Sequence, residues 1–146
     1  MEKEDFIWEL WQVTRELQRS RFGLCLEFCK KYDLTQQQVR ILLQIKANKS
    51  TILTELAEEL DINPGNLSKT CKSLEEKGFI KRVRHQDDKR VWTITLAPKG
   101  IQATDEITDH IVKVYTTFSS KHKDEELKKM LSLLREYAQF YHDLVE

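Results

Sequence analysis

The stretch from Asp61 to Gly100 reads DINPGNLSKTCKSLEEKGFIKRVRHQDDKRVWTITLAPKG, and its first half carries the signals of a well-bounded helix. Asn63 is a favourable N-cap residue, and Pro64 suits the first helical position because its missing N–H would have no partner there. Gly78 suits the position just past a helix end. We therefore expect a helix from about Pro64 to Lys77.

The two faces of this helix differ in chemistry. The residues that follow the three-four spacing of a buried stripe are Leu67, Thr70, Cys71 and Leu74. The outward face begins with small polar residues and becomes basic further along. Such a face fits a DNA major groove, because small residues permit close approach, Asn and Ser can bond base edges, and Lys can reach phosphate or guanine. A solvated surface helix is the alternative interpretation. The residues of the cap and outward face that we expect to contact DNA are Asn63, Gly65, Asn66, Ser68, Lys69 and Lys72.

Two short segments after the helix predict a β-hairpin with a polar tip. Both are rich in β-branched and aromatic residues, and they span residues 79–84 and 91–96. In the second segment Trp92, Ile94 and Leu96 alternate with other residues, which predicts that one face of this strand packs on the core. An ordinary solvated turn is the alternative interpretation of the tip.

The tip of the hairpin is basic, and Arg90 is its strongest candidate for a DNA contact. A guanidinium can enter the narrow, electronegative minor groove while the preceding helix occupies the adjacent major groove. Arg84 and Lys89 are the other basic residues of the hairpin that we expect to contact DNA. Asp88 cannot favourably touch phosphate, so we expect it to bond Arg90 or backbone N–H groups and to orient the arginine.

A helix followed by a basic hairpin indicates a winged helix-turn-helix, and the segment from Ile52 to Gly100 resembles the DNA-binding core of the multiple antibiotic resistance regulator (MarR) family. The resemblance rests on the two-helix turn, the Leu-Glu-Glu-Lys-Gly helix ending, the Asp-x-Arg wing and the Leu-x-x-Lys-Gly exit. It implies a dimeric bacterial or archaeal transcription regulator, usually a repressor, whose DNA affinity often responds to a small molecule, a metal or an oxidant. It also implies that Arg90 is the family's wing arginine and that Asp88 is its aspartate partner.

One position departs from the family pattern. Ile52 stands where the family often supplies a Ser or Thr cap three residues before Glu55. Ser50 and Thr51 are therefore the candidate caps of the first helix of the helix-turn-helix.

The rest of the chain predicts a mainly α fold of the α+β class. Helical patterns run from about Lys3 to Tyr32 and, after a Thr cap, from residue 35 through Lys46, with a turn at residues 47–50. The buried stripe of the first helix of the helix-turn-helix consists of Leu53, Leu56, Ala57 and Leu60. Beyond Gly100 two further helical stripes are separated by a polar break at residues 119–123.

The apolar stripes of the terminal helices are too extensive for a domain as small as the winged helix to cover. We therefore expect the N- and C-terminal helices of two chains to interdigitate in a two-fold homodimer, with intrachain packing as the alternative. One intertwined unit then has an N-terminal dimerisation helix region at 1–34, a winged helix-turn-helix at 35–100 and C-terminal dimerisation helices at 101–146. Two-fold symmetry predicts a pseudo-palindromic operator in double-stranded DNA, read by two helices about 34 Å apart or a small multiple of that distance.

The chain of 146 residues contains 24 basic and 24 acidic residues, but the two signs are segregated. Residues 64–100 contain nine Lys or Arg and four Asp or Glu, a net charge of +5, which leaves −5 for the remainder. A basic face on a neutral protein predicts salt-sensitive binding to nucleic acid. The sequence has neither a run of about eighteen apolar residues nor a signal-peptide pattern, so we expect a cytoplasmic protein with no membrane contact.

The regulatory input is harder to predict than DNA binding. Cys25 and Cys29 share one helical face, a spacing compatible with thiol sensing, with metal binding or with simple packing. A disulfide between them is not expected, because Cβ atoms at that spacing lie about 5–6 Å apart and a bridge needs about 3.5–4.5 Å. A metal site joining Cys29, His110 and a carboxylate such as Glu27 is a further alternative, although the histidines are scattered. The preferred input is a small apolar or aromatic molecule in a cleft between the dimer helices and the winged domain, with no metal or other cofactor.

Two other functional classes find less support. The sequence has no Gly-rich phosphate loop, nucleophile elbow or paired-histidine helix motif, so it does not indicate an enzyme. A protein-interaction module could share the winged helix fold, but the basic face argues against that function.

Overall fold

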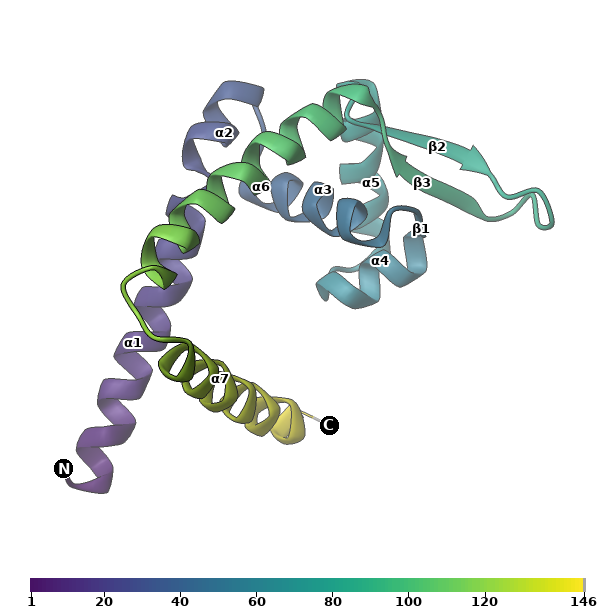
Figure 1. Ribbon diagram of the computed structural model, residues 1–146. Coiled ribbons are helices and arrows are strands. Elements are labelled where there is room, and N and C mark those ends of the chain that lie inside the picture. The colour runs from purple at the N-terminus through teal and green to yellow at the C-terminus, as the bar shows by residue number, and fades with distance from the viewer. Residues whose placement is uncertain (146) are drawn as a thin grey trace. The chain divides into compact units, whose positions relative to one another are not determined.

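The structure is a computed structural model that describes residues 1–145, and it confirms the predicted fold class (Figure 1). Within these residues the fold is mainly helical, with one three-stranded antiparallel sheet. The elements are α1 (Lys3–Gly23), α2 (Leu26–Tyr32), α3 (Gln36–Asn48), β1 (Thr51–Ile52), α4 (Leu53–Leu60), α5 (Pro64–Glu76), β2 (Ile80–Arg84), β3 (Trp92–Leu96), α6 (Pro98–Ser119) and α7 (Asp124–Val145). The chain divides into two compact units, residues 1–108 and residues 109 onward. None of the described helices is long and apolar enough to cross a membrane.

The first unit has a hydrophobic core built by α3, α4, α5, the sheet and the beginning of α6. Its fully buried side chains include Ile41, Leu42, Ile45, Leu56, Leu67, Leu74, Phe79, Ile94 and Ile107. The stripes predicted for the helix-turn-helix lie inward, with Leu53 and Thr70 half-buried and the other members buried. Because one face of α5 is anchored in this core, its opposite face is held towards solvent.

The sheet has the strand order β1-β3-β2, and both pairings are antiparallel. β2 and β3 form the predicted hairpin, with register partners that run from Ile80↔Leu96 to Arg84↔Trp92. The two-residue strand β1 pairs with the inner part of β3 through Thr51↔Ile94 and was not predicted. This pairing joins the hairpin to the start of α4.

The predicted start of α3 is confirmed, but its end is not. Thr35 and Gln38 form a reciprocal capping box, in which the Gln38 N–H donates to Thr35 Oγ1 at 3.1 Å. The helix then continues past Lys46 to Asn48, so the turn expected at residues 47–50 is reduced to its last two residues. The Asn48 side chain accepts a hydrogen bond from Gln44 and donates one to Glu59 of α4, and these bonds stabilise the extra helical residues.

Two other sequence predictions are wrong in detail. The N-terminal helical region is interrupted, because α1 ends at Gly23, a residue with low helix propensity, and a new helix starts after Cys25. The cap of α4 is Ile52, which offers no side-chain hydrogen bond, rather than Ser50 or Thr51. The backbone of Thr51 is engaged in the sheet, and its hydroxyl bonds the Ile52 carbonyl, so it is not available as a cap.

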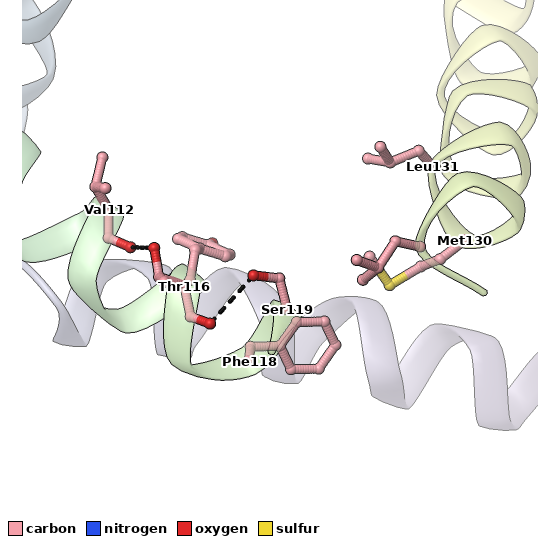
Figure 2. A pocket seen from close by; sticks show the side chains of 8 residues that line it. Val112, Thr116, Phe118, Ser119, Met130 and Leu131 are labelled. Atoms are coloured by element: carbon pink, nitrogen blue, oxygen red, sulfur yellow. Dashed lines mark hydrogen bonds between the residues drawn. The ribbon is translucent and has the colours of Figure 1, made fainter. Parts of the chain in front are cut away.

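The terminal helices carry much uncovered apolar surface. Neither α1 nor α7 has a buried residue, although both carry several aromatic and aliphatic side chains. Within the second unit, the end of α6 and the start of α7 enclose an apolar groove of about 380 Å³ (Figure 2). Met130 and Leu131 project from α7 into this groove, whereas the hydroxyl of Thr116 on α6 donates to the carbonyl of Val112.

Candidate nucleic-acid interface

The helix α5 begins and ends where its local chemistry predicts. Asn63 Oδ1 accepts hydrogen bonds from the backbone N–H groups of Gly65 and Asn66, at 2.9 and 3.4 Å. The side-chain oxygen of Asn63 is thus engaged as the N-cap, which leaves its amide group for any outward contact. At the other end Gly78 adopts φ of 84°, a left-handed conformation that glycine tolerates better than other residues. The helix is therefore confirmed within one residue of the predicted bounds.

The outward face of α5 is accessible in the structure. Gly65, Asn66, Lys69 and Lys72 are exposed, and Ser68 is half-buried. The small residues lie in the first turn and the two lysines follow one and two turns later, as the sequence predicted. A DNA duplex could therefore approach the start of α5 closely, with the ammonium groups at its flank.

A groove joins α5 to the hairpin. It has a volume of about 340 Å³, and its polar lining comes from Thr54 of α4, Ser68 of α5 and the hairpin residues Arg82 and Arg90, with Trp92 beside them. The structure therefore brings Ser68 and Arg90 to one concave surface, although 22 positions separate them in the chain. This surface runs without interruption from α5, the candidate helix for the major groove, to the hairpin of β2 and β3, which is the wing.

The tip of the hairpin has a defined turn. Asp88 Oδ1 accepts a hydrogen bond from the backbone N–H of Arg90 at 3.0 Å, and the Asp88 carbonyl accepts one from Val91 at 3.0 Å. Of the two partners expected for Asp88, the structure therefore selects the backbone. The carboxylate sets the direction of the chain at Arg90 rather than pairing with its guanidinium. Arg84, Lys89 and Arg90 are all exposed.

An ion pair that sequence reasoning missed connects α5 to β2. Arg82 Nε and Nη2 donate to the two carboxylate oxygens of Glu75 at 3.1 and 3.0 Å. The hydrogen bonds from Arg82 hold the pKa of Glu75 below its ordinary value, and those same bonds raise the pKa of Arg82. A bidentate pair of this kind restrains both position and orientation, so it ties the wing to the helix. The sequence signal was a Glu and an Arg on either side of a glycine-containing turn, which is common and therefore weak.

Glu75→Gln is expected to lower the free energy of unfolding by about 1 kcal/mol at neutral pH, and by progressively less in acid. The pKa of Glu75 is depressed below 4.5, so its stabilising contribution is present above that pH and is lost as the pH falls through the folded-state pKa. Urea unfolding of both proteins between about pH 7 and pH 3 measures the difference. Glu76→Gln, at the exposed neighbouring acid, is the matched control. A Glu75→Gln effect that is independent of pH would contradict this role of the ion pair.

Trp92 does not pack on the core as the alternation predicted. Its side chain is 40% exposed, and Leu96 is only half-buried, so Ile94 is the residue of this face that is fully enclosed. Trp92 lies instead beneath two arginines, with the guanidinium carbons of Arg82 and Arg84 at 5.7 and 5.0 Å from its ring centroid. The hairpin has already left the body of the protein at this position, so the alternating pattern continues without a core to receive the side chain.

The three cysteine thiols all have pKa values above the ordinary value. Burial raises the pKa values of the Cys25 and Cys29 thiols, and it raises the pKa of Cys71 to about 11. Thiols with raised pKa values are less reactive at neutral pH, which favours packing over thiol sensing. Among residues 1–145 no three His, Cys, Asp or Glu side chains are placed to hold a metal ion.

Comparison of the sequence with known proteins finds relatives among DNA-binding regulators. The model of the MarR family matches residues 34–92. A helix-turn-helix transcriptional regulator of Bacillus cereus is 35% identical over 105 residues, which cover 72% of this chain and 69% of the relative. The chain belongs to the MarR family. Its resemblance to the MarR family therefore extends beyond the segment from Ile52 to Gly100, and the protein is a MarR-family transcriptional regulator.

Further similar proteins were found by sequence and by structure. The regulator SarZ of Staphylococcus aureus is 26% identical over 111 residues, 76% of this chain and 74% of SarZ. Streptococcus pneumoniae FabT, solved in complex with DNA, superimposes with a TM-score of 0.77 at 23% identity, over 92% of this chain and 99% of FabT. A mutant of Escherichia coli MarR, solved with operator DNA, gives a TM-score of 0.72 at 19% identity, over 94% and 99% of the two chains.

Proposed function

We propose that this MarR-family regulator binds a pseudo-palindromic operator in double-stranded DNA as a homodimer, represses transcription there and is released by a small-molecule effector. The observation that supports it most strongly is the continuous surface formed by the outward face of α5, the groove and the basic wing. In this proposal α5 lies in the major groove and Arg90 reaches the adjacent minor groove. That FabT and MarR have been solved with DNA is consistent with this assignment.

The contacts divide into two kinds. Asn66 and Ser68 can read base edges from the start of α5, where small side chains allow the closest approach. Lys69, Lys72 and Arg84 supply charge for the phosphate backbone, which sets register and affinity rather than sequence preference. The net charge of +5 over residues 64–100 makes the affinity depend on salt.

The homodimer is supported by the uncovered apolar faces of the terminal helices. Trp8 and Trp11 of α1 and Leu134 and Tyr141 of α7 are exposed in a single chain. Apolar surface of this kind on a helix is typical of an interface, and the groove between α6 and α7 is a further apolar surface. We propose that residues 1–34 and 101–146 form the dimerisation region, which places two copies of α5 against one face of the duplex.

The effector that we propose is a small apolar or aromatic molecule that stabilises a different spacing of the two DNA-binding lobes. The raised pKa values of Cys25 and Cys29 weaken the alternative in which an oxidant acts on these thiols. A metal input is weakened by the lack of a metal-binding cluster among residues 1–145.

The experiment is the selection of genomic fragments by the purified protein, followed by fluorescence anisotropy on the enriched sequence. We expect a palindromic fragment and a plot of log affinity against log salt with a slope of about −5 to −7, the value for a dimer in which each subunit neutralises about three or four phosphates. An affinity that is flat between about 50 and 200 mM salt would contradict DNA binding through this face.

Three further arms test the remaining parts of the proposal. Light scattering in solution is expected to give the mass of a dimer, and a monomer at micromolar concentration would overturn the dimer model.

Transcription in vitro from a template with the selected operator is expected to fall, whereas a rise would indicate an activator. Binding is then repeated with peroxide, zinc, a chelator and a panel of aromatic acids. Release by peroxide or zinc instead of an aromatic compound would contradict the proposed effector.

A further inference from the structure

Three side chains form a row on one face of the hairpin, between the core and the tip. Arg84 and Trp92 are register partners, and Arg82 is the partner of Ile94. Partners in an antiparallel pair share a face, and residues two apart on a strand do so as well. Arg82, Trp92 and Arg84 therefore lie on the face that buries Ile94, at the point where that face emerges from the core.

The first arginine of the row is already committed to a partner. Both carboxylate oxygens of Glu75 accept hydrogen bonds from Arg82, which is half-buried. This pair fixes the Arg82 guanidinium beside α5 and neutralises its charge. Trp92 packs against the fixed group, at 5.7 Å between guanidinium carbon and ring centroid, so the ring has a defined position although the residue is 40% exposed.

The second arginine of the row is in a different position. Arg84 is exposed and its guanidinium carbon lies 5.0 Å from the same ring centroid, within the range of a cation–π contact. Stacking occupies the flat face of a guanidinium and leaves its in-plane N–H donors free to bond a phosphate. An exposed arginine loses rotamer entropy when it binds, and a side chain that is held in advance loses less.

We infer that Trp92, held in place by the Glu75–Arg82 pair, is a positioning residue that presents the Arg84 guanidinium to the DNA backbone next to α5, the proposed recognition helix. This inference rests on the proposed DNA-binding function. It assigns Trp92 no contact with a base. The ring acts through Arg84, and the pair of Glu75 and Arg82 couples the orientation of α5 to the direction of that arginine.

A double-mutant cycle tests this mechanism. Operator affinity is measured for the wild type, Trp92→Leu, Arg84→Ala and the double variant, with folding checked by circular dichroism. Trp92→Leu is expected to weaken binding about tenfold in the presence of Arg84, because two subunits each lose a stacked arginine, and less than about twofold in the Arg84→Ala background. Trp92→Phe retains an aromatic face and is expected to recover most of the affinity.

The outcomes separate positioning from support of the hairpin. Equal losses in the two backgrounds would mean that Trp92 supports the wing or touches DNA itself, and unchanged affinity in Trp92→Leu would equally overturn the inference. If Trp92→Leu unfolds, Arg84→Lys tests the same idea with Trp92 unchanged. It keeps the charge but replaces the planar group, so a loss close to that of Arg84→Ala is expected and full retention would overturn the inference.

The same measurements distinguish this inference from the proposed function. A wild-type protein that selects no DNA would overturn both. A wild-type protein that binds its operator and loses affinity with Lys69→Ala, but shows an additive cycle, would overturn only the positioning role of Trp92.

Discussion

Gly100→Ala is expected to destabilise the protein by about 3 kcal/mol or more, the largest stability effect that we predict. A Cβ atom at this position would lie 2.0 Å from the carbonyl oxygen of Phe79 and 3.1 Å from its carbonyl carbon. The contact is with backbone, so no side-chain rotation can relieve it. The start of α6 would have to move away from the hairpin, which would also open the core around Phe79.

The local hydrogen bonds leave little room for such a movement. The Phe79 carbonyl accepts from the Ala97 N–H at 2.9 Å, and the Phe79 N–H donates to the Leu74 carbonyl at 2.9 Å. Hydrogen bonds at both the carbonyl and the N–H of Phe79 therefore restrain the carbonyl that the new methyl group would contact. This close approach explains why the exit motif of the wing ends in glycine.

Thermal unfolding followed by circular dichroism measures the effect. A loss of about 3 kcal/mol corresponds to a fall in Tm of about 6–12 °C for a chain of this size. Gly23→Ala is the matched control, because a Cβ there meets no atom within 4 Å. Its Tm is expected to stay the same or rise slightly, since alanine has the higher helix propensity. If the Tm of Gly100→Ala equals that of the control, the start of α6 can shift without a loss in the free energy of unfolding, which would contradict this prediction.

Arg90→Ala is expected to weaken operator binding about a hundredfold, the largest binding effect that we predict. Each of two subunits would lose a charge-assisted contact in the electronegative minor groove, at about 1–2 kcal/mol per contact. The Asp88 bond to the Arg90 backbone N–H does not involve the side chain, so the turn is expected to remain intact. The dimer should therefore stay folded while its affinity falls.

Lys69→Ala distinguishes a phosphate contact from the minor-groove contact. It is expected to weaken binding to all sequences about equally and to reduce the salt slope by about 1 per subunit. Lys121→Ala, in the exposed segment between α6 and α7, removes the same charge outside the proposed interface and is the matched control. Anisotropy titrations at several salt concentrations measure all three variants. Unchanged affinity in both Arg90→Ala and Lys69→Ala would show that DNA is not bound by this face.

Local backbone chemistry was enough to predict the recognition helix and its cap. Asn63, Pro64 and Gly78 act on the backbone within a few residues of their own positions, so their effect does not depend on the rest of the fold. The buried stripe of α5 was predictable for a related reason, because a helix has a fixed period and the core receives one face. The Asp88 bond at the wing is also local, and one of its two expected partners was correct.

The interruption of the first helix, the length of α3 and the cap of α4 were not predictable in the same way. Each depends on a partner far along the chain or on a small difference in free energy between continuing and ending a helix. Asn48 extends α3 through a bond to Glu59, and Thr51 is taken into the sheet by pairing with Ile94. The sequence contains these residues but not the distances between them.

The sequence by itself determined that this chain would present a capped helix and a basic hairpin, because caps, turn residues and hydrophobic period are read from neighbouring positions. Tertiary structure alone decided what the side chains at the base of the wing do. The alternation of β3 predicts Trp92 in the core, but the hairpin leaves the core before that position, and the ring packs against Arg82 and Arg84 instead. The period of a strand predicts which face a residue occupies. Whether other parts of the protein cover that face depends on the packed fold.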